Sequence, residues 1–506
     1  MTALDLLGTD FATMPDLLAA HALERPDKVA LADEHATLTY AALDRRTAAV
    51  VAALQRDGVA PGTAVAIVAA SSVDYAAVFL GAVRAGCPAA PLSPSATAQA
   101  IAAMVADCSA PIVFVDAVNA EALAGQALPK TVVFGVEFEA WLSPDAPAPV
   151  AIGPDDAFNI IYSSGTTGNP KGIVQSHAMR WGHIARNTAA GWGDAVTMVA
   201  TPLYSNTTLV SFLPTMGWGG TAVLMPKFDA GAYLQLAERH RATHTMLVPV
   251  QYQRLMAHPA FDATDLSRFR FKTCTSAPFS AALKADVLAR WPGMLVEYYG
   301  MTEGGGTCAL NCSAHPDKLH TVGPPLPGHD IRLIDNDGRE VAPGEAGEVV
   351  GRSGTMMTGY YGRGDATRAA EWFDADGHRY IRHGDIGRFD ADGFLILMDR
   401  VKDLIISGGF NVYPSDLEAV LAEHPAVAEC TVIGMPSVDW GETPVGIYVA
   451  KPGAVEDAES VRAWANARLG KTQRLSVLHH ADELPRSAIG KVLKRELRER
   501  LLGMSA

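Results

Sequence analysis

Residues 162–172, YSSGTTGNPKG, carry side chains that suit the binding of a phosphate group. Gly165, Gly168 and Gly172 permit positive φ angles and let a ligand approach the backbone closely. Hydrogen-bond donors and one positive charge come from Ser163, Ser164, Thr166, Thr167 and Lys171. The run FNIIYS before the loop predicts a buried strand. The residues after it, 172–189, predict a helix whose dipole would add to the attraction for an anion.

The loop does not match the nucleotide-binding P-loop, whose pattern is GxxxxGK[ST]. Only two residues separate Gly165 from Gly168, and Gly172 follows Lys171 where a hydroxyl residue is needed. A flexible surface turn between two elements would explain the same glycines. The loop by itself therefore leaves phosphate binding open, and the choice depends on other motifs.

A second motif, YYGMTEG at residues 298–304, combines three kinds of side chain that a nucleotide site needs. Tyr299 offers an aromatic face for a base, and Thr302 offers a hydroxyl group for a phosphate. Glu303 offers a hard carboxylate oxygen, the ligand type that Mg²⁺ prefers. A core aromatic residue and a solvated turn are the simpler explanations of each residue taken singly.

Three further segments of the sequence belong with these two motifs. The short TSAP segment lies at 275–278, and RHGDIGRFDADGFLILMDRVKDLIISGGFNVYP occupies 382–414. The third, LPRSAIGKVLKREL at 484–497, contains Lys491. This lysine follows a glycine at the start of a predicted amphipathic helix, 491–502, and lies off its leucine stripe. One cation among several on a solvated helix is the simpler explanation.

Together and in this order, the motifs resemble those of the adenylate-forming (ANL) superfamily, in its acyl- and aryl-CoA synthetase branch of AMP-dependent acid–CoA ligases. The resemblance runs from LTYAALDRR at residue 38 to Lys491. It implies an enzyme that uses ATP and Mg²⁺ to convert a carboxylic acid to acyl-AMP, with release of pyrophosphate. Transfer of the acyl group to coenzyme A then gives acyl-CoA and AMP. Loading of a carrier protein and a catalytically silent nucleotide-binding homologue are the alternatives.

The resemblance also implies roles for individual residues of this chain. Lys491, Thr302 and Glu303 would be catalytic, with Glu303 positioning Mg²⁺, and Lys402 would be the hinge about which the C-terminal part rotates. The glycine loop would hold the β- and γ-phosphates. Binding of ATP, AMP and coenzyme A would involve Ser163, Ser164, Gly165, Thr166, Thr167, Gly168, Lys171, Ser276, Ala277, Pro278, Tyr298, Tyr299, Gly300, Met301, Thr302, Asp385, Arg400, Gly408, Gly409 and Asn411.

The acid is expected to bind at TPLYSNTTLVSF, the segment that lines the acyl pocket in similar proteins. Tyr204, Ser205 and Asn206, together with Gly304, would form the wall, and the histidine common at this place is missing. The segment has no aspartate for an amino group, and residues 201–218 contain no arginine for a second carboxylate. A medium-chain fatty acid or a substituted aromatic acid is therefore expected.

The order of elements predicts an α/β protein. Strand and helix patterns alternate through the first 325 residues, which favours two parallel-type α/β subdomains. Short strands between turn residues predict a small β-barrel subdomain at 328–398, which completes a large N-terminal domain, 1–398. A hinge at 399–402 and a small mobile α/β C-terminal domain at 403–506 are expected to follow.

Composition narrows the class of protein. The 506 residues carry a net charge of −14, which argues against a nucleic-acid partner because phosphate backbones are bound by clustered Lys and Arg. Six scattered cysteines without metal-ligand spacing favour a reducing compartment. No signal peptide and no apolar run of about 20 residues is recognised, so a cytoplasmic location is expected. The expected partners are the acid, ATP and coenzyme A, with a homodimer left open.

Overall fold

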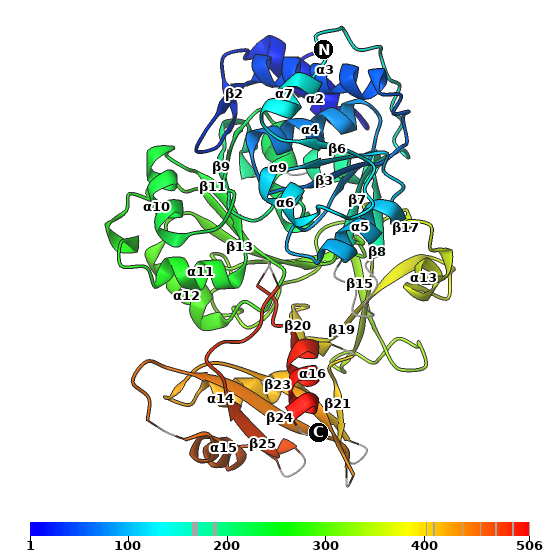
Figure 1. Ribbon diagram of the computed structural model, residues 1–506. Coiled ribbons are helices and arrows are strands. Elements are labelled where there is room, and N and C mark those ends of the chain that lie inside the picture. The colour runs from blue at the N-terminus through cyan, green and yellow to red at the C-terminus, as the bar shows by residue number, and fades with distance from the viewer. Residues whose placement is uncertain are drawn as a thin grey trace. The chain divides into compact units, whose positions relative to one another are not determined.

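The computed structural model describes residues 1–163, 171–185, 190–400, 402–407, 410–438, 440–455, 457–470, 473–487 and 490–504 (Figure 1). The chain forms two compact units. The first contains Met1–Leu319, Pro325–Asp330 and Gly351–Ile381, and the second contains His320–Pro324, Ile331–Val350 and Arg382–Ala506.

A seven-stranded sheet of the first unit has the order β17-β8-β7-β4-β3-β5-β6. Its strands are β3 (Val65–Val68), β4 (Ala89–Pro91), β5 (Ile112–Val115), β6 (Lys130–Val133), β7 (Ala157–Ser163), β8 (Lys171–Ser176) and β17 (Gly359–Tyr360). The pairs among β3 to β7 are parallel, whereas β7, β8 and β17 pair antiparallel. The predicted parallel type is therefore confirmed, with an antiparallel extension at one edge.

Both faces of this sheet are buried, as the unbroken apolar run of β3 requires. Val65 and Ile67 belong to a core shared with α3 (Tyr40–Arg56) and α4 (Val73–Arg84). Ala66 and Val68 belong to a second core on the opposite face, with residues of α5. The other helices of this part are α1 (Ala3–Leu7), α2 (Met14–Glu24), α5 (Ala98–Asp107), α6 (Ala117–Ala122) and α7 (Val136–Trp141).

An eight-stranded sheet completes the first unit, in the order β14-β13-β12-β11-β9-β10-β1-β2. Its strands are β1 (Val29–Ala32), β2 (Thr37–Thr39), β9 (Val196–Val199), β10 (Thr221–Leu224), β11 (His244–Leu247), β12 (Phe271–Cys274), β13 (Met294–Gly300) and β14 (Thr307–Asn311). Only the two edge strands pair antiparallel with their neighbours. The helices are α8 (His177–Ala185), α9 (Asn206–Gly217), α10 (Ala230–Arg239), α11 (Pro249–Met256) and α12 (Ala281–Arg290).

The β-rich region predicted at 328–398 forms a five-stranded sheet of order β15-β16-β19-β18, with β20 paired to β19. The strands are β15 (Asp330–Ile334), β16 (Gly347–Arg352), β18 (Glu371–Phe373), β19 (Arg379–Phe389) and β20 (Leu395–Arg400), and helix α13 (Gly364–Ala369) precedes β18. The pairs β18–β19 and β19–β20 are antiparallel. The expectation of a small β subdomain is confirmed, and the domain limits stay a prediction.

The C-terminal part of the second unit is a small α/β structure. Its sheet has the order β22-β21-β24-β23, and β25 pairs with β24. The elements are β21 (Ile405–Ser407), β22 (Phe410–Val412), α14 (Pro414–Ala422), β23 (Val427–Ser437), β24 (Gly441–Ala450), α15 (Ala458–Asn466), β25 (Val477–His480) and α16 (Lys494–Met504). The predicted helix 491–502 thus begins three residues later than expected.

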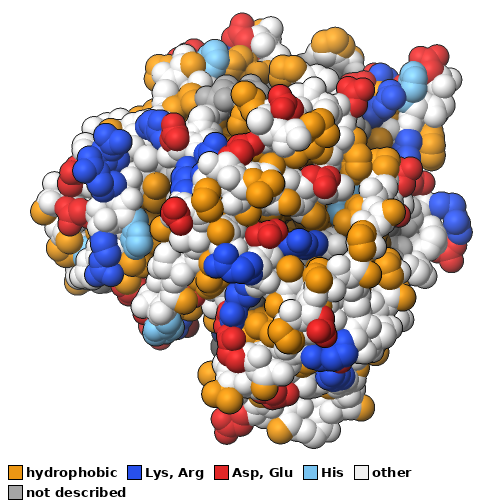
Figure 2. Space-filling model, turned by 90° about the horizontal axis from the view of Figure 1, so that it is seen from above, with side chains coloured by type: hydrophobic (Ala, Val, Ile, Leu, Met, Phe, Trp, Pro, Cys, Tyr) orange, Lys and Arg blue, Asp and Glu red, His pale blue; other side chains and the backbone are white. Residues whose placement is uncertain are grey.

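Charged side chains of both signs are present on the surface (Figure 2). On the part of the face in Figure 2 that the structure describes, basic and acidic side chains are interspersed. Among the described residues, no helix has both the length and the apolar character needed to cross a bilayer.

Candidate active site

The glycine loop connects two strands of a hairpin. Ser163 at the end of β7 pairs directly with Lys171 at the start of β8. The prediction that a helix begins at residue 172 is wrong, because residues 171–176 form a strand and α8 begins at His177. The N-terminus of α8 therefore lies six residues beyond the first residue of β8, Lys171. Some predicted binding residues lie outside the described residues, namely Ser164, Gly165, Thr166, Thr167, Gly168, Gly408 and Gly409, as do the side chains of Ser163 and Asn411.

One acidic side chain links the strand before the loop to a segment distant in the sequence. Asp107, at the end of α5, accepts a hydrogen bond from the Tyr162 phenol at 2.7 Å. The other oxygen of Asp107 accepts one from the Arg363 guanidinium at 2.8 Å. Burial, together with the neighbouring Asp107 charge, raises the pKa of Tyr162 above its ordinary value, so the phenol stays protonated as a donor. The base of the hairpin is thereby tied to the segment that follows β17.

Gly172 is needed at the base of the hairpin for steric reasons. A Cβ atom at this position would lie 2.7 Å from Ile160 Cγ2 and 3.2 Å from Tyr162 Cζ. The carbonyl of Gly172 also accepts a hydrogen bond from the Tyr361 backbone N–H at 2.7 Å. The last glycine of the motif therefore serves the packing of two strands, a role that its sequence pattern did not reveal.

The structure brings Lys171 of the loop close to Glu303 of the second motif. The Lys171 ammonium lies 5.1 Å from the centre of the Tyr360 ring, a cation–π distance. The phenol of Tyr360 donates to Glu303 Oε1 at 2.8 Å. Burial raises the pKa of Tyr360, and the Glu303 charge raises it further. A cation and a carboxylate on one aromatic residue form a site that suits an anion carrying a divalent cation.

The turn at 302–304 is held at three consecutive carbonyl groups, one by a donor on β8 and two by donors between β16 and β17. All three hydrogen bonds measure 2.7 Å, and the donors, in order, are Gln175 Nε2, Met357 N and Ser353 Oγ. Such a turn has little freedom to reorient its side chains. The motifs in the sequence did not indicate a role for these donors or for Tyr360. The one available signal was Gln175, a polar residue within an apolar strand.

Gly304 packs against the backbone of a neighbouring segment. Its φ is +75°, and a Cβ atom there would lie 2.0 Å from the carbonyl oxygen of Thr355. Neither a left-handed backbone nor this contact tolerates a side chain. The position predicted to line an acyl pocket is thus fixed as glycine by the protein itself.

Several other predicted residues lie where parallel strands of the eight-stranded sheet end. The segment of Ser276, Ala277 and Pro278 follows β12, and Tyr298 and Tyr299 lie at the end of β13. Gly300 and Met301 continue from there into the turn. The carboxyl edge of a parallel sheet is the usual place for a ligand.

Two loops at this edge are in contact. Thr207, at the start of α9, shares a hydrogen bond of 2.6 Å with the hydroxyl of Ser276. Ser276 has a φ of +81°, which is strained for a residue with a side chain. This hydrogen bond therefore links the expected acyl segment to the TSAP segment, and the strained backbone lies at their junction.

The residues predicted to contact the acid differ in their surroundings. Burial raises the pKa of Tyr204, and hydrogen bonds with Ser93 and Ser95 oppose that rise. Ser205 is buried, and Asn206 begins α9. The Oδ1 atom of Asn206 is buried without a hydrogen-bond partner among the described residues. The asparagine carbonyl thus keeps an unused acceptor.

The second unit contains the other predicted residues. Asp385 and Arg400 are opposite each other on β19 and β20, and Arg400 Nε lies 3.1 Å from Asp385 Oδ1. Burial lowers the pKa of Lys402, and the Arg400 charge acts in the same direction. Lys491 lies in a turn before α16, where its carbonyl accepts from Ser487 N at 2.8 Å. Lys171, Thr302 and Glu303 belong to the first unit instead.

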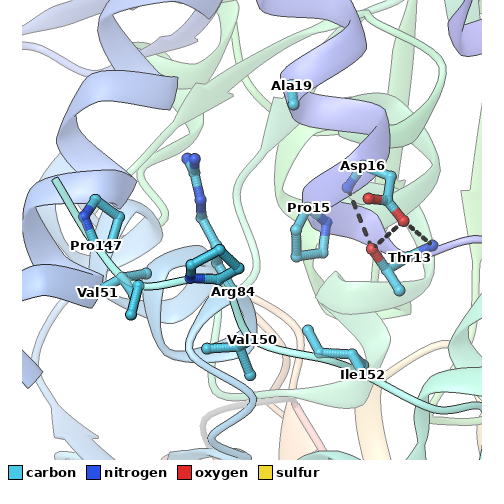
Figure 3. Close-up of a pocket in the computed structure, with 11 residues that line it drawn as sticks. Thr13, Pro15, Asp16, Ala19, Val51, Arg84, Pro147, Val150 and Ile152 are labelled. Atoms are coloured by element: carbon cyan, nitrogen blue, oxygen red, sulfur yellow. Dashed lines mark hydrogen bonds between the residues drawn. The ribbon is translucent and has the colours of Figure 1, made fainter. Parts of the chain in front are cut away.

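A surface pocket of about 410 Å³ contains none of the predicted residues (Figure 3). It lies between α2 and the segment around Val150 and Ile152. The one cation that lines it, Arg84, already donates to Asp44 at 2.7 Å. The pocket is therefore not the site that the motifs describe.

Comparison with known proteins identifies the family. A family model described as AMP-binding enzyme matches residues 18–361, and one for the C-terminal domain of these enzymes matches 416–491. A feruloyl-CoA synthase from an Amycolatopsis species is 34% identical over 484 residues, covering 94% of this chain and 96% of the relative. The fatty acid–[acyl-carrier-protein] ligase ScoC from Streptomyces coeruleorubidus is 32% identical, covering 98% and 97%.

Solved structures agree with this result. The crystal structure of ATP-bound MatB from Rhodopseudomonas palustris superposes with a TM-score of 0.86 at 29% identity, covering 98% of this chain and all of the other. The fold, the sequence similarity and the order of the motifs therefore indicate the same family. The chain belongs to the AMP-binding enzyme family, in the group of adenylate-forming acid–CoA ligases.

Proposed function

We propose that the protein activates a carboxylic acid with ATP and passes the acyl group to coenzyme A. The observation that supports this most is the cluster of Lys171, Tyr360 and Glu303, which brings two distant motifs together. The loop and Lys171 bind the β- and γ-phosphates, and Thr302 binds the α-phosphate. Glu303 fits Mg²⁺ as a ligand because Tyr360 engages one carboxylate oxygen and orients the other. The ion would neutralise phosphate charge there.

In the first half-reaction a carboxylate oxygen of the acid attacks the α-phosphorus. A P–O bond to the acid forms, the bond to the β-phosphate bridge breaks, and pyrophosphate leaves with the electron pair. Both reactants are anions, so the protein must supply positive charge where they meet. We assign that role to Lys491, and Lys171 stays with the phosphates that leave.

In the second half-reaction the thiolate of coenzyme A attacks the acyl carbon, and AMP leaves. The residues around the acyl carbon must change between the two steps. We propose that the C-terminal part, 403–506, rotates about Lys402 relative to 1–398 and withdraws Lys491. Asp385 would accept hydrogen bonds from the ribose hydroxyls, while Arg400 holds its carboxylate in place. Gly408, Gly409 and Asn411 would then lie on the side of the C-terminal part that meets the acyl-adenylate when the thioester forms.

The acid is proposed to be a medium-chain fatty acid or a substituted aromatic acid. The relatives support both classes, since one acts on ferulate and the other on a fatty acid by name. The unused acceptor on Asn206 would suit a substrate hydroxyl group and favours a phenolic acid. Release of AMP across ferulate, 4-coumarate, benzoate and octanoate, each with and without coenzyme A, tests the assignment. No acid-dependent AMP or pyrophosphate release would refute it.

A carrier protein is the second candidate acceptor, because the relative ScoC is named for one. The same assay separates the two acceptors. Thioester formation with coenzyme A alone supports the proposal, whereas formation only with a phosphopantetheinylated carrier supports the alternative. Acyl-AMP formation is common to both outcomes and would be measured as ATP–pyrophosphate exchange.

A further inference from the structure

A buried polar network lies behind the second motif, on residues that no motif includes. Asn159 on β7, Gln175 on β8 and Arg180 on α8 are all fully buried. Arg180 Nε donates to Asn159 Oδ1 at 2.8 Å, and Arg180 Nη2 donates to Gln175 Oε1. Asn159 Nδ2 donates to the same Gln175 oxygen at 2.8 Å. One side of the Gln175 amide is thus saturated by two donors.

This saturation fixes the direction of the glutamine side chain. Because Oε1 accepts two hydrogen bonds, the Nε2 group must point the other way, where it donates to the Thr302 carbonyl at 2.7 Å. No described carboxylate pairs with Arg180, whose guanidinium contacts two amide oxygens and, at 3.5 Å, His183 Nδ1. Burial lowers the pKa of Arg180 to about 9, so it remains charged at neutral pH. The charge polarises the Gln175 amide and strengthens its donor.

Burying a cation without a carboxylate is costly, and an apolar core at these positions would be simpler. This energetic cost indicates a function, because the chain of hydrogen bonds ends on one carbonyl of the candidate site, that of Thr302. The two following carbonyls are held by a backbone N–H and a serine. Only the one at Thr302 depends on a buried charge.

We propose that Gln175, oriented by Arg180 and Asn159, is a positioning residue for adenylation. It fixes the Thr302 carbonyl, and so the direction in which the Thr302 hydroxyl and the Glu303 carboxylate leave the turn. This inference rests on the proposed function, because those two groups are the ones assigned to the α-phosphate and to Mg²⁺. Gln175 itself touches no reactant.

The substitution Gln175→Glu tests the contact with Thr302 while it keeps the acceptor that orients the side chain. A glutamate keeps an acceptor for Arg180 and Asn159 and gives the buried cation a carboxylate partner. The donor to Thr302 is replaced by an oxygen, which cannot donate and repels the Thr302 carbonyl. We expect kcat for ATP–pyrophosphate exchange to fall about tenfold, the effect of one hydrogen bond in the transition state. The KM for the acid and the midpoint of thermal unfolding should stay close to the wild-type values.

Gln55→Glu is the matched control. Gln55 Nε2 donates to the Ala148 carbonyl at 2.9 Å, the same kind of contact in the same unit and outside the candidate site. It should leave exchange within about twofold of the wild type. Should Gln175→Glu fail to fold, Gln175→Met removes the same donor without adding a charge. Because it also removes the acceptor shared by Arg180 and Asn159, its kcat is compared with wild type at a temperature below its own unfolding midpoint.

A double-mutant cycle with Thr302→Ala gives the decisive measurement. If Gln175 acts through the turn, the loss caused by Gln175→Glu should shrink in that background to the part that comes from the Glu303 carboxylate. Additive losses, or unchanged exchange in the single variant, would overturn the inference. Wild-type protein that shows no exchange with any acid would instead overturn the proposed function, so the two failures are distinguishable.

Discussion

Removing the phenolic oxygen of Tyr360 tests how the Lys171–Tyr360–Glu303 cluster works. Tyr360→Phe keeps the ring that lies 5.1 Å from the Lys171 ammonium. It removes only the donor that holds Glu303 Oε1 at 2.8 Å. The Glu303 carboxylate then loses a fixed direction while the cation–π contact remains. We expect weaker use of Mg²⁺ and slower adenylation.

The magnitude follows from the contact. A hydrogen bond to a charged group contributes about 1.5–3 kcal/mol, and the lower end applies because Tyr360 is only half-buried, so water can replace part of the contact. A loss of about 1.4 kcal/mol lowers kcat/KM about tenfold. Tyr360→Leu also removes the ring and should cost roughly 0.5–1 kcal/mol more, through the contact with Lys171.

The assay is ATP–pyrophosphate exchange over a range of Mg²⁺ concentrations. The Phe variant should need more Mg²⁺ for half-maximal rate. Tyr361→Phe is the control, because Tyr361 reaches the hairpin through its backbone N–H. Equal rates and equal Mg²⁺ dependence for Tyr360→Phe and wild type would refute the reasoning, and so would equal losses in the Phe and Leu variants.

Three more outcomes are expected. Lys491→Ala should abolish most adenylation yet spare thioester formation from preformed acyl-adenylate, and equal loss of both steps would contradict two conformations. Gly304→Ala should lower the unfolding free energy by about 3 kcal/mol or more in denaturant titrations, since its Cβ would meet the Thr355 carbonyl. Burial lowers the pKa of His177 and His244 to about 4. The unfolded chain therefore binds protons first, and stability should fall by roughly 2–3 kcal/mol per histidine from pH 6.5 to 4.5. Stability unchanged over that range would contradict it.

Local patterns were sufficient for the elements that are buried on both faces. The alternating strand and helix patterns expected in the first 325 residues are confirmed at β3 and α4, because the apolar spacing of these segments is decided by neighbours in sequence. The segment GIVQS was assigned to a helix and forms β8. Its strand state depends on pairing with β7 and with β17, almost two hundred residues away, and short segments carry little information about such partners.

The candidate site shows the same division. Motif order indicated the family and the residues at strand ends, and the comparisons confirmed the family. The contact of Tyr360 with Glu303 joins residues 57 apart, and that of Gln175 with Thr302 joins residues 127 apart. No spacing rule predicts either contact, because each results from the way the β8 edge meets the turn after β13.

The hairpin base has a consequence for how the glycine loop can vary. Strand β8 is aligned on one side by the Ser163–Lys171 and Tyr162–Gly172 pairs and on the other by Tyr360, which lies opposite Ile173. Since side chains alternate along a strand, this double alignment sets the direction of Lys171. The lysine is thus aimed by its own strand. In the proposed function, substitutions among residues 164–170 would change the contacts of the loop with the nucleotide, whereas the direction of Lys171 would be kept by β8.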